Sequence, residues 1–136
     1  MRLVVTIDVE EDQWGMRKGR QSTTDNIRQI PALTAVFRDF NIVPTYLVTF
    51  PVVSDDGAVA ILRHAYDAGQ CEIGMHCHPW TTPPFEESIT RYNSMLCNLD
   101  PLLQRRKLHR LHEAIGDQQA EVELAQAPVL ALGADE

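Results

Sequence analysis

Residues 3–10 read LVVTIDVE, a stretch that decides the fold class because it joins a short apolar run to two carboxylates. The run before Asp8 is apolar and β-branched, which is typical of a buried strand. Two later runs, Thr45–Thr49 and Glu72–Met75, have the same strand-like character. Apolar residues between and after these runs recur at spacings of three and four, which indicates helices. This alternation of strands and helices predicts an α/β fold with a parallel sheet.

Capping and turn residues set the expected boundaries of the helices. Pro31 marks a helix start or a kink within the apolar pattern that begins near residue 26. Asp55 begins the next helix, and Gly69 stands where a C-terminal cap belongs. Asp100, followed by a proline, predicts an N-cap for the last helix, and we expect Gly116 to end that helix.

The composition is that of a globular chain of one domain. The 136 residues are 44% apolar and 23% charged, with a formal net charge of −7. Residues 116–136 contain five acidic residues and no Lys or Arg, so the rest of the chain is close to neutral and gives no electrostatic support for nucleic-acid binding. The run 105–107, Arg-Arg-Lys, is interpreted as a solvated helix face. We expect residues 1–116 to form the domain and 117–136 to be a weakly specified, disordered tail.

Cellular location is suggested by what the sequence contains and lacks. No apolar segment is long enough for a signal peptide or a membrane span. Cys71, Cys77 and Cys97 form an odd set without CxxC spacing, which favours free thiols in a reducing compartment. The sequence therefore predicts a cytoplasmic protein without a membrane partner.

Two polar groups directly follow strand-like runs and are the candidates for chemistry. Asp8 and Glu10 follow the first run, and His76 and His78 follow the third. Residues i and i+2 of an extended chain point to the same side, so each pair can face one pocket at the carboxyl edge of the sheet. Cys77 then points the other way, which disfavours a cysteine nucleophile with a neighbouring histidine as its base.

Two imidazoles and a carboxylate are a common ligand set for Zn²⁺ or a similar divalent ion, and a second carboxylate could accept a proton from water. This combination predicts metal-assisted hydrolysis. The alternatives are a solvated acidic turn at residues 10–12 and hydrogen-bonded structural histidines. Trp14 and Trp80 follow the two strand ends and would serve either as an aromatic platform for a sugar ring or as packing residues.

Three segments, 4–15 (VVTIDVEEDQWG), 43–52 (VPTYLVTFPV) and 71–85 (CEIGMHCHPWTTPPF), resemble in order and spacing the N-terminal half of a NodB-type polysaccharide deacetylase. The resemblance implies a distorted (β/α) barrel that uses a divalent metal to remove acetyl groups from N-acetylated sugars. By the match to the Asp-x-Asp/Glu form of the first motif, Asp8 corresponds to the catalytic base and Glu10 to a metal ligand. His76 matches the first histidine of the second motif. Trp80 occupies the usual place of the second histidine, so His78 replaces it, as in the HxHPW variant.

The resemblance covers residues 2 to about 116. The family also uses an arginine and a histidine from later motifs, but no Arg follows Arg110 and no His follows His112. A complete barrel also needs about 200 residues or more. We therefore expect about three βα units from a truncated product with weak or no activity. The expected cofactor is Zn²⁺, with Co²⁺, Ni²⁺ or Mn²⁺ as alternatives. A non-catalytic metal-binding fragment and a hydrolase of another C–N bond, in a small amide, are the other hypotheses.

Overall fold

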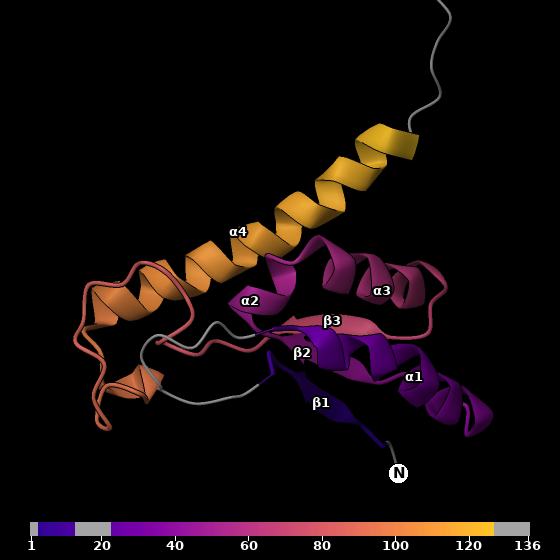
Figure 1. Ribbon diagram of the computed structural model, residues 1–136, viewed down its shortest axis with the longest axis horizontal. Helices are drawn as coiled ribbons and strands as arrows, with labels where there is room; N and C mark the ends of the chain where they lie inside the picture. The colour runs from indigo at the N-terminus through magenta and orange to yellow at the C-terminus, as the bar shows by residue number, and fades with distance from the viewer. Residues whose placement is uncertain (1–2, 13–22, 127–136) are drawn as a thin grey trace, which may run out of the picture.

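The computed structural model describes residues 3–12 and 23–126, with side chains described as far as Asp117. Its sheet contains three strands in the order β1 (Thr6–Val9), β2 (Thr45–Val48) and β3 (Glu72–Met75). Both neighbouring pairs are parallel, and Asp8 lies opposite Leu47, which lies opposite Gly74. The prediction of an α/β fold with a parallel sheet is confirmed. Figure 1 shows the helices α2 and α3 between this sheet and the long helix α4.

Strand β1 begins three residues later than the apolar run suggests. Leu3 and Val4 are each 68% exposed, so the expectation of a buried strand from Leu3 is wrong at this end. In the observed register Thr6 lies opposite Thr45, and the residue before Thr45 is Pro44. The Thr45 N–H donates to the Val5 carbonyl at 2.9 Å, whereas the backbone of Pro44 faces β3, since its carbonyl accepts from the Glu72 N–H at 2.9 Å.

The helical elements follow the expected order, with two short additions. They are η1 (Asp25–Gln29), α1 (Ile30–Asp39), α2 (Phe50–Val53), α3 (Asp56–Asp67), η2 (Leu96–Asn98) and α4 (Pro101–Gln126). Pro31 lies in the first turn of α1, as predicted. The Asp55 side chain accepts a hydrogen bond from the Ala58 N–H at 2.7 Å and caps α3. Gly69, with φ at +66°, follows the C-cap of α3 in the left-handed conformation that favours glycine.

Helix α4 does not end at Gly116, as the sequence suggested, but continues to Gln126. A single glycine inside a helix costs about 1 kcal/mol relative to alanine. The ten residues after Gly116 include no proline and are rich in Ala, Gln and Glu, which favour helix. The local propensity on both sides therefore outweighs the glycine. Residues 127–136 of the predicted tail lie outside the described part of the chain.

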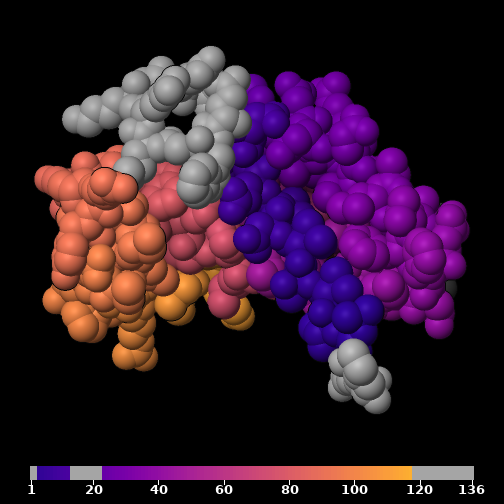
Figure 2. All heavy atoms as spheres, turned by 90° about the horizontal axis from the view of Figure 1, so that it is seen from below, coloured from indigo at the N-terminus to yellow at the C-terminus, as the bar shows by residue number. Residues whose placement is uncertain are grey.

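The core lies on one face of the sheet, under the helices. Tyr46 and Val48 of β2 are fully buried, and the Tyr46 hydroxyl is 2.8 Å from the Thr34 hydroxyl of α1. Helix α4 joins this core through Leu111, which is also fully buried. The other face of the sheet carries Asp8 and is more open, and Figure 2 shows atoms of the N-terminal segment at the surface on this side.

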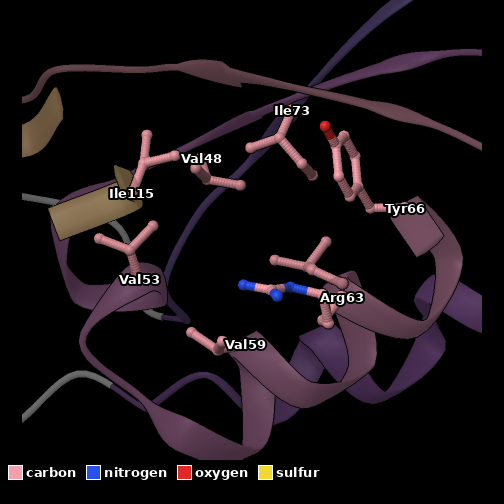
Figure 3. Close-up of a pocket in the computed structure, with 8 residues that line it drawn as sticks. Val48, Val53, Val59, Arg63, Tyr66, Ile73 and Ile115 are labelled. Carbon is pink, nitrogen blue, oxygen red and sulfur yellow. The ribbon is translucent and has the colours of Figure 1, made fainter. Parts of the chain in front are cut away.

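A small apolar cavity of about 50 Å³ lies among β2, β3, α2, α3 and the middle of α4 (Figure 3). Val48, Val53, Ile73 and Ile115 contribute to its wall, and the guanidinium of Arg63 lies among these apolar side chains. The cavity therefore belongs to the helical side of the sheet, away from the carboxylates and histidines described below. None of the helices in the described part of the chain combines the length and apolar character needed to cross a membrane.

Candidate metal centre

Glu10, His76 and His78 bring three ligand atoms together beyond the carboxyl ends of β1 and β3. Glu10 Oε1 lies 2.9 Å from His76 Nε2 and 3.3 Å from His78 Nε2. The two imidazole Nε2 atoms are 2.8 Å apart. These atoms come from segments more than 60 residues apart in the sequence, and they all lie within 4.8 Å of one another. The predicted meeting of the two polar groups is therefore confirmed.

The sheet and a neighbouring turn position these side chains. The His76 N–H donates to the Val48 carbonyl at 2.9 Å, which continues the β2–β3 ladder to the first histidine. The Asn26 side-chain amide donates to the Glu10 carbonyl at 2.9 Å and fixes the chain just beyond β1. Asp12 accepts hydrogen bonds from the Thr23 hydroxyl and the Asn26 N–H at 2.9 and 3.2 Å. The backbone of Glu10 is thus held by the start of η1 as well as by the sheet.

The spacing of the three atoms fits one divalent ion. An ion with bonds of about 2.0–2.1 Å in tetrahedral geometry separates its ligand atoms by about 3.3 Å. The observed separations of 2.8, 2.9 and 3.3 Å are equal to this value or a few tenths of an ångström shorter. Glu10, His76 and His78 therefore form a cluster that could hold a divalent metal ion with little movement.

Burial sets the electrostatics of the cluster. Desolvation raises the pKa of Glu10; the His76 ring opposes this shift, while the charges of Asp8 and Glu11 add to it. Burial, with a smaller contribution from His76, lowers the pKa of His78. A lowered pKa favours the neutral imidazole, which is the form that binds metal. The raised pKa of Glu10 means that the charged form of this partly buried carboxylate is costly until a cation compensates it.

Asp8 lies beside the cluster rather than within it. Its side chain is 56% exposed, and Oδ1 is 3.6 Å from His76 Nδ1. That separation exceeds the usual hydrogen-bond range of about 2.7–3.2 Å. The Asp8 carboxylate therefore lies near the Nδ1 edge of the His76 ring, opposite the Nε2 edge that faces Glu10. The carboxylate itself is open to water.

The remaining predicted residues have different positions. Cys77 packs against the hydrophobic core, so its thiol points away from the histidines as expected. Burial raises the pKa of this thiol. Trp80 is half-buried, and its ring stacks on His78 with centroids 4.3 Å apart and an interplanar angle of 18°. Trp14 lies outside the described residues. The three cysteines are free thiols, as predicted.

Two charged residues near the cluster were missed. Glu11 is only 4% exposed, and its Oε2 accepts a hydrogen bond from the Thr49 hydroxyl at 2.8 Å. Lys107 is fully buried, so the interpretation of residues 105–107 as a solvated helix face is wrong for this residue, although Arg105 and Arg106 are exposed. The sequence period of each element places both residues on the side that faces the core. Glu11 continues the alternation of Ile7 and Val9 toward the core, and Lys107 lies four residues from each of the buried Leu103 and Leu111.

Three comparisons, with protein-family models, with curated proteins and with solved structures, found no match to this chain. The fold and the cluster define an α/β protein with a candidate divalent-metal site.

Proposed function

We propose that this chain carries the metal-binding part of a hydrolase of the NodB-type polysaccharide deacetylase class, which removes acetyl groups from N-acetylated sugars. The observation that supports this proposal most directly is the convergence of Glu10 Oε1 with the Nε2 atoms of His76 and His78 at the carboxyl edge of a parallel sheet. This edge is where α/β proteins gather their functional residues.

In the proposed site, Glu10, His76 and His78 hold the ion, with Zn²⁺ as the expected metal and Co²⁺, Ni²⁺ or Mn²⁺ as alternatives. A divalent ion at such a site lowers the pKa of water from about 15.7 toward about 7 and polarises a carbonyl group. His78 remains neutral and able to bind because burial lowers its pKa.

Asp8 is the proposed general base. Its carboxylate is exposed to water and lies 3.6 Å from His76 Nδ1, too far for a hydrogen bond that would commit it to that ring. It can therefore accept a proton from a water molecule that approaches the cluster. Its charge beside Nδ1 also favours the tautomer in which Nε2 is available to the ion.

The arrangement of the strands supports the same class. Successive strands are neighbours, β1 beside β2 and β2 beside β3, and both pairs are parallel, as at the start of a (β/α) barrel. We propose that residues 3–116 correspond to about three βα units of such a barrel.

The sugar-binding role is assigned to Trp80. One face of its ring stacks on His78, which places the indole directly beside the proposed metal, and its partial exposure leaves surface for a ligand. An aromatic ring next to the reacting centre provides a flat apolar surface for a sugar. Trp14 is proposed for the same role from the sequence alone.

The test is acetate release from chito-oligosaccharides and peptidoglycan fragments, with small cyclic amides as the competing substrate class. Any activity should disappear on chelation and return with Zn²⁺. Asp8→Asn should lower the rate by about 10²–10⁴-fold, the usual contribution of a general base, while metal binding is retained. Glu113→Gln, which makes the same kind of change at an exposed carboxylate of α4, is the control.

The outcomes separate the hypotheses. Metal binding without acetate release would support a non-catalytic metal-binding role. Turnover of the cyclic amides alone would favour a hydrolase of another C–N bond. If His76→Ala binds Zn²⁺ as tightly as the wild type, the ligand assignment is wrong.

A further inference from the structure

Lys107 of α4 places a fully buried ammonium group inside the loop that follows the histidines. Its Nζ donates to the carbonyl oxygens of Pro79, Thr82 and Pro84 at 2.9, 2.6 and 2.7 Å. It also lies 2.9 Å from Glu87 Oε1, and this carboxylate is only 9% exposed. A buried charge persists in a protein when it is paired and hydrogen-bonded, and both conditions hold here.

The loop has a particular need for such a donor. Three of its residues are prolines, which have no N–H and cannot pair with one another through the backbone. Their carbonyl groups still require donors when they are buried. One lysine from a distant helix supplies donors to Pro79, Thr82 and Pro84 together, so the shape of the loop depends on the position of α4.

This loop is directly connected to the metal cluster. The His78 carbonyl accepts hydrogen bonds from the Thr81 and Thr82 N–H groups at 3.2 and 3.0 Å, which close a turn around the histidine. The His78 ring then stacks on Trp80 of the same turn. Lys107 binds the carbonyl of Thr82 within this turn and that of Pro79 next to His78.

We propose that Lys107 is a positioning residue for the metal centre. By drawing the carbonyl groups of Pro79, Thr82 and Pro84 around its ammonium, it fixes the turn that aims His78 Nε2 at Glu10 and His76. This inference rests on the proposed metal site and adds to it a determinant on α4 that binds the loop carbonyls and supplies no ligand atom of the cluster. Because coupling is reciprocal, metal binding at His78 also stabilises the contact between the loop and α4.

The test compares Co²⁺ binding by the wild type, Lys107→Met and Arg105→Met. Methionine keeps the length and apolar character of the lysine stem and removes the ammonium. Arg105 is exposed on the same helix, so its variant loses the same charge and keeps the buried ammonium that binds the loop carbonyls. Affinity is measured by titration, and the visible absorption of the cobalt-saturated protein reports the number and arrangement of ligands. Far-ultraviolet circular dichroism establishes whether each variant is folded.

The expected result is that Lys107→Met binds Co²⁺ about 10–100-fold more weakly, as is usual for residues that support metal ligands, and shows an altered cobalt spectrum. Arg105→Met should match the wild type in both respects. A folded Lys107→Met with the affinity and spectrum of the wild type would overturn the inference. A wild type that binds no Co²⁺ would instead overturn the metal site, and the positioning role with it.

Lys107→Met could fail to fold, because it leaves a buried carboxylate and three carbonyl groups without their donor. Hydrogen exchange in the wild type then decides the matter. Zn²⁺ should slow exchange of the amides of residues 80–82 and of the part of α4 around Lys107, as well as at the ends of the strands. Protection restricted to β1, β3 and the histidines would refute the coupling.

Discussion

Replacement of Glu10 by glutamine should change the stability of the protein in opposite directions with and without metal. Glu10 supplies one of the three ligand atoms of the proposed site, and its Oε1 lies close to both imidazoles. Its pKa is raised mainly by burial. A raised pKa means that stability is present below the unfolded value, near 4.5, and is lost as pH rises through the folded pKa. At pH 7 the metal-free Glu10→Gln variant should therefore be at least as stable as the wild type.

Zinc should reverse this order. Free Zn²⁺ at 100 times the dissociation constant stabilises the wild type by about 2.7 kcal/mol. For a chain of this size each kcal/mol is worth roughly 4 °C, so the wild-type midpoint should rise by about 10 °C. If the loss of one ligand weakens binding by about 100-fold, the variant gains only about 0.4 kcal/mol at the same free Zn²⁺, or roughly 2 °C.

The assay is thermal unfolding at pH 7 with free Zn²⁺ set by a chelator buffer, after titration has given the wild-type affinity. Glu113→Gln, at an exposed carboxylate, should behave as the wild type with and without zinc. A Glu10→Gln variant that gains as much from Zn²⁺ as the wild type would show that Glu10 is not a ligand. A metal-free variant that unfolds well below the wild type would show that burial does not dominate the electrostatics of Glu10.

Three further outcomes are expected. Thr49→Val removes the hydroxyl that donates to buried Glu11 at 2.8 Å and should lower the free energy of unfolding by about 1.5–3 kcal/mol in urea melts. The same change should cost less in a Glu11→Gln background, and an equal loss in both backgrounds would contradict the pairing. Leu111→Ala should cost about 2–5 kcal/mol, because this α4 side chain is fully buried, and a loss below 1 kcal/mol would mean that α4 is not packed as described. Burial raises the pKa of Cys71 from 9.0 to about 11, so the folded state should lose stability as pH rises from 9 toward 11, and Cys71→Ala should remove that part of the loss. At pH 8 iodoacetamide should modify exposed Cys97 well before Cys71.

The strands and the candidate metal-binding cluster could be predicted because their signals are local. The alternation of strand and helix identifies a parallel sheet, and residues that follow its strands must meet at one edge. Asp8, Glu10, His76 and His78 were therefore expected at one edge without knowledge of any distance, and the structure brings Glu10, His76 and His78 together with Asp8 beside them. The errors concern the extent of elements. β1 begins at Thr6 and leaves Leu3 and Val4 exposed, and α4 runs through Gly116 because the residues on both sides favour helix.

Glu11 and Lys107 were missed for a different physical reason. Each occupies an apolar position in its element's period, yet a charged residue at such a position is normally exposed, and only a partner makes its burial affordable. Those partners are distant in sequence: Thr49 lies 38 residues from Glu11, and the carbonyl groups that bind Lys107 lie 23–28 residues away. Periodicity can therefore place a charged side chain on the core side of its element, but it cannot show that a hydrogen-bonding partner is present there. Glu11 follows Glu10 at the end of β1, and Lys107 binds the turn that contains His78, so both buried charges lie next to a proposed metal ligand. Burial by itself disfavours the charges of Glu11 and Lys107, yet both are found beside the segments that position Glu10 and His78.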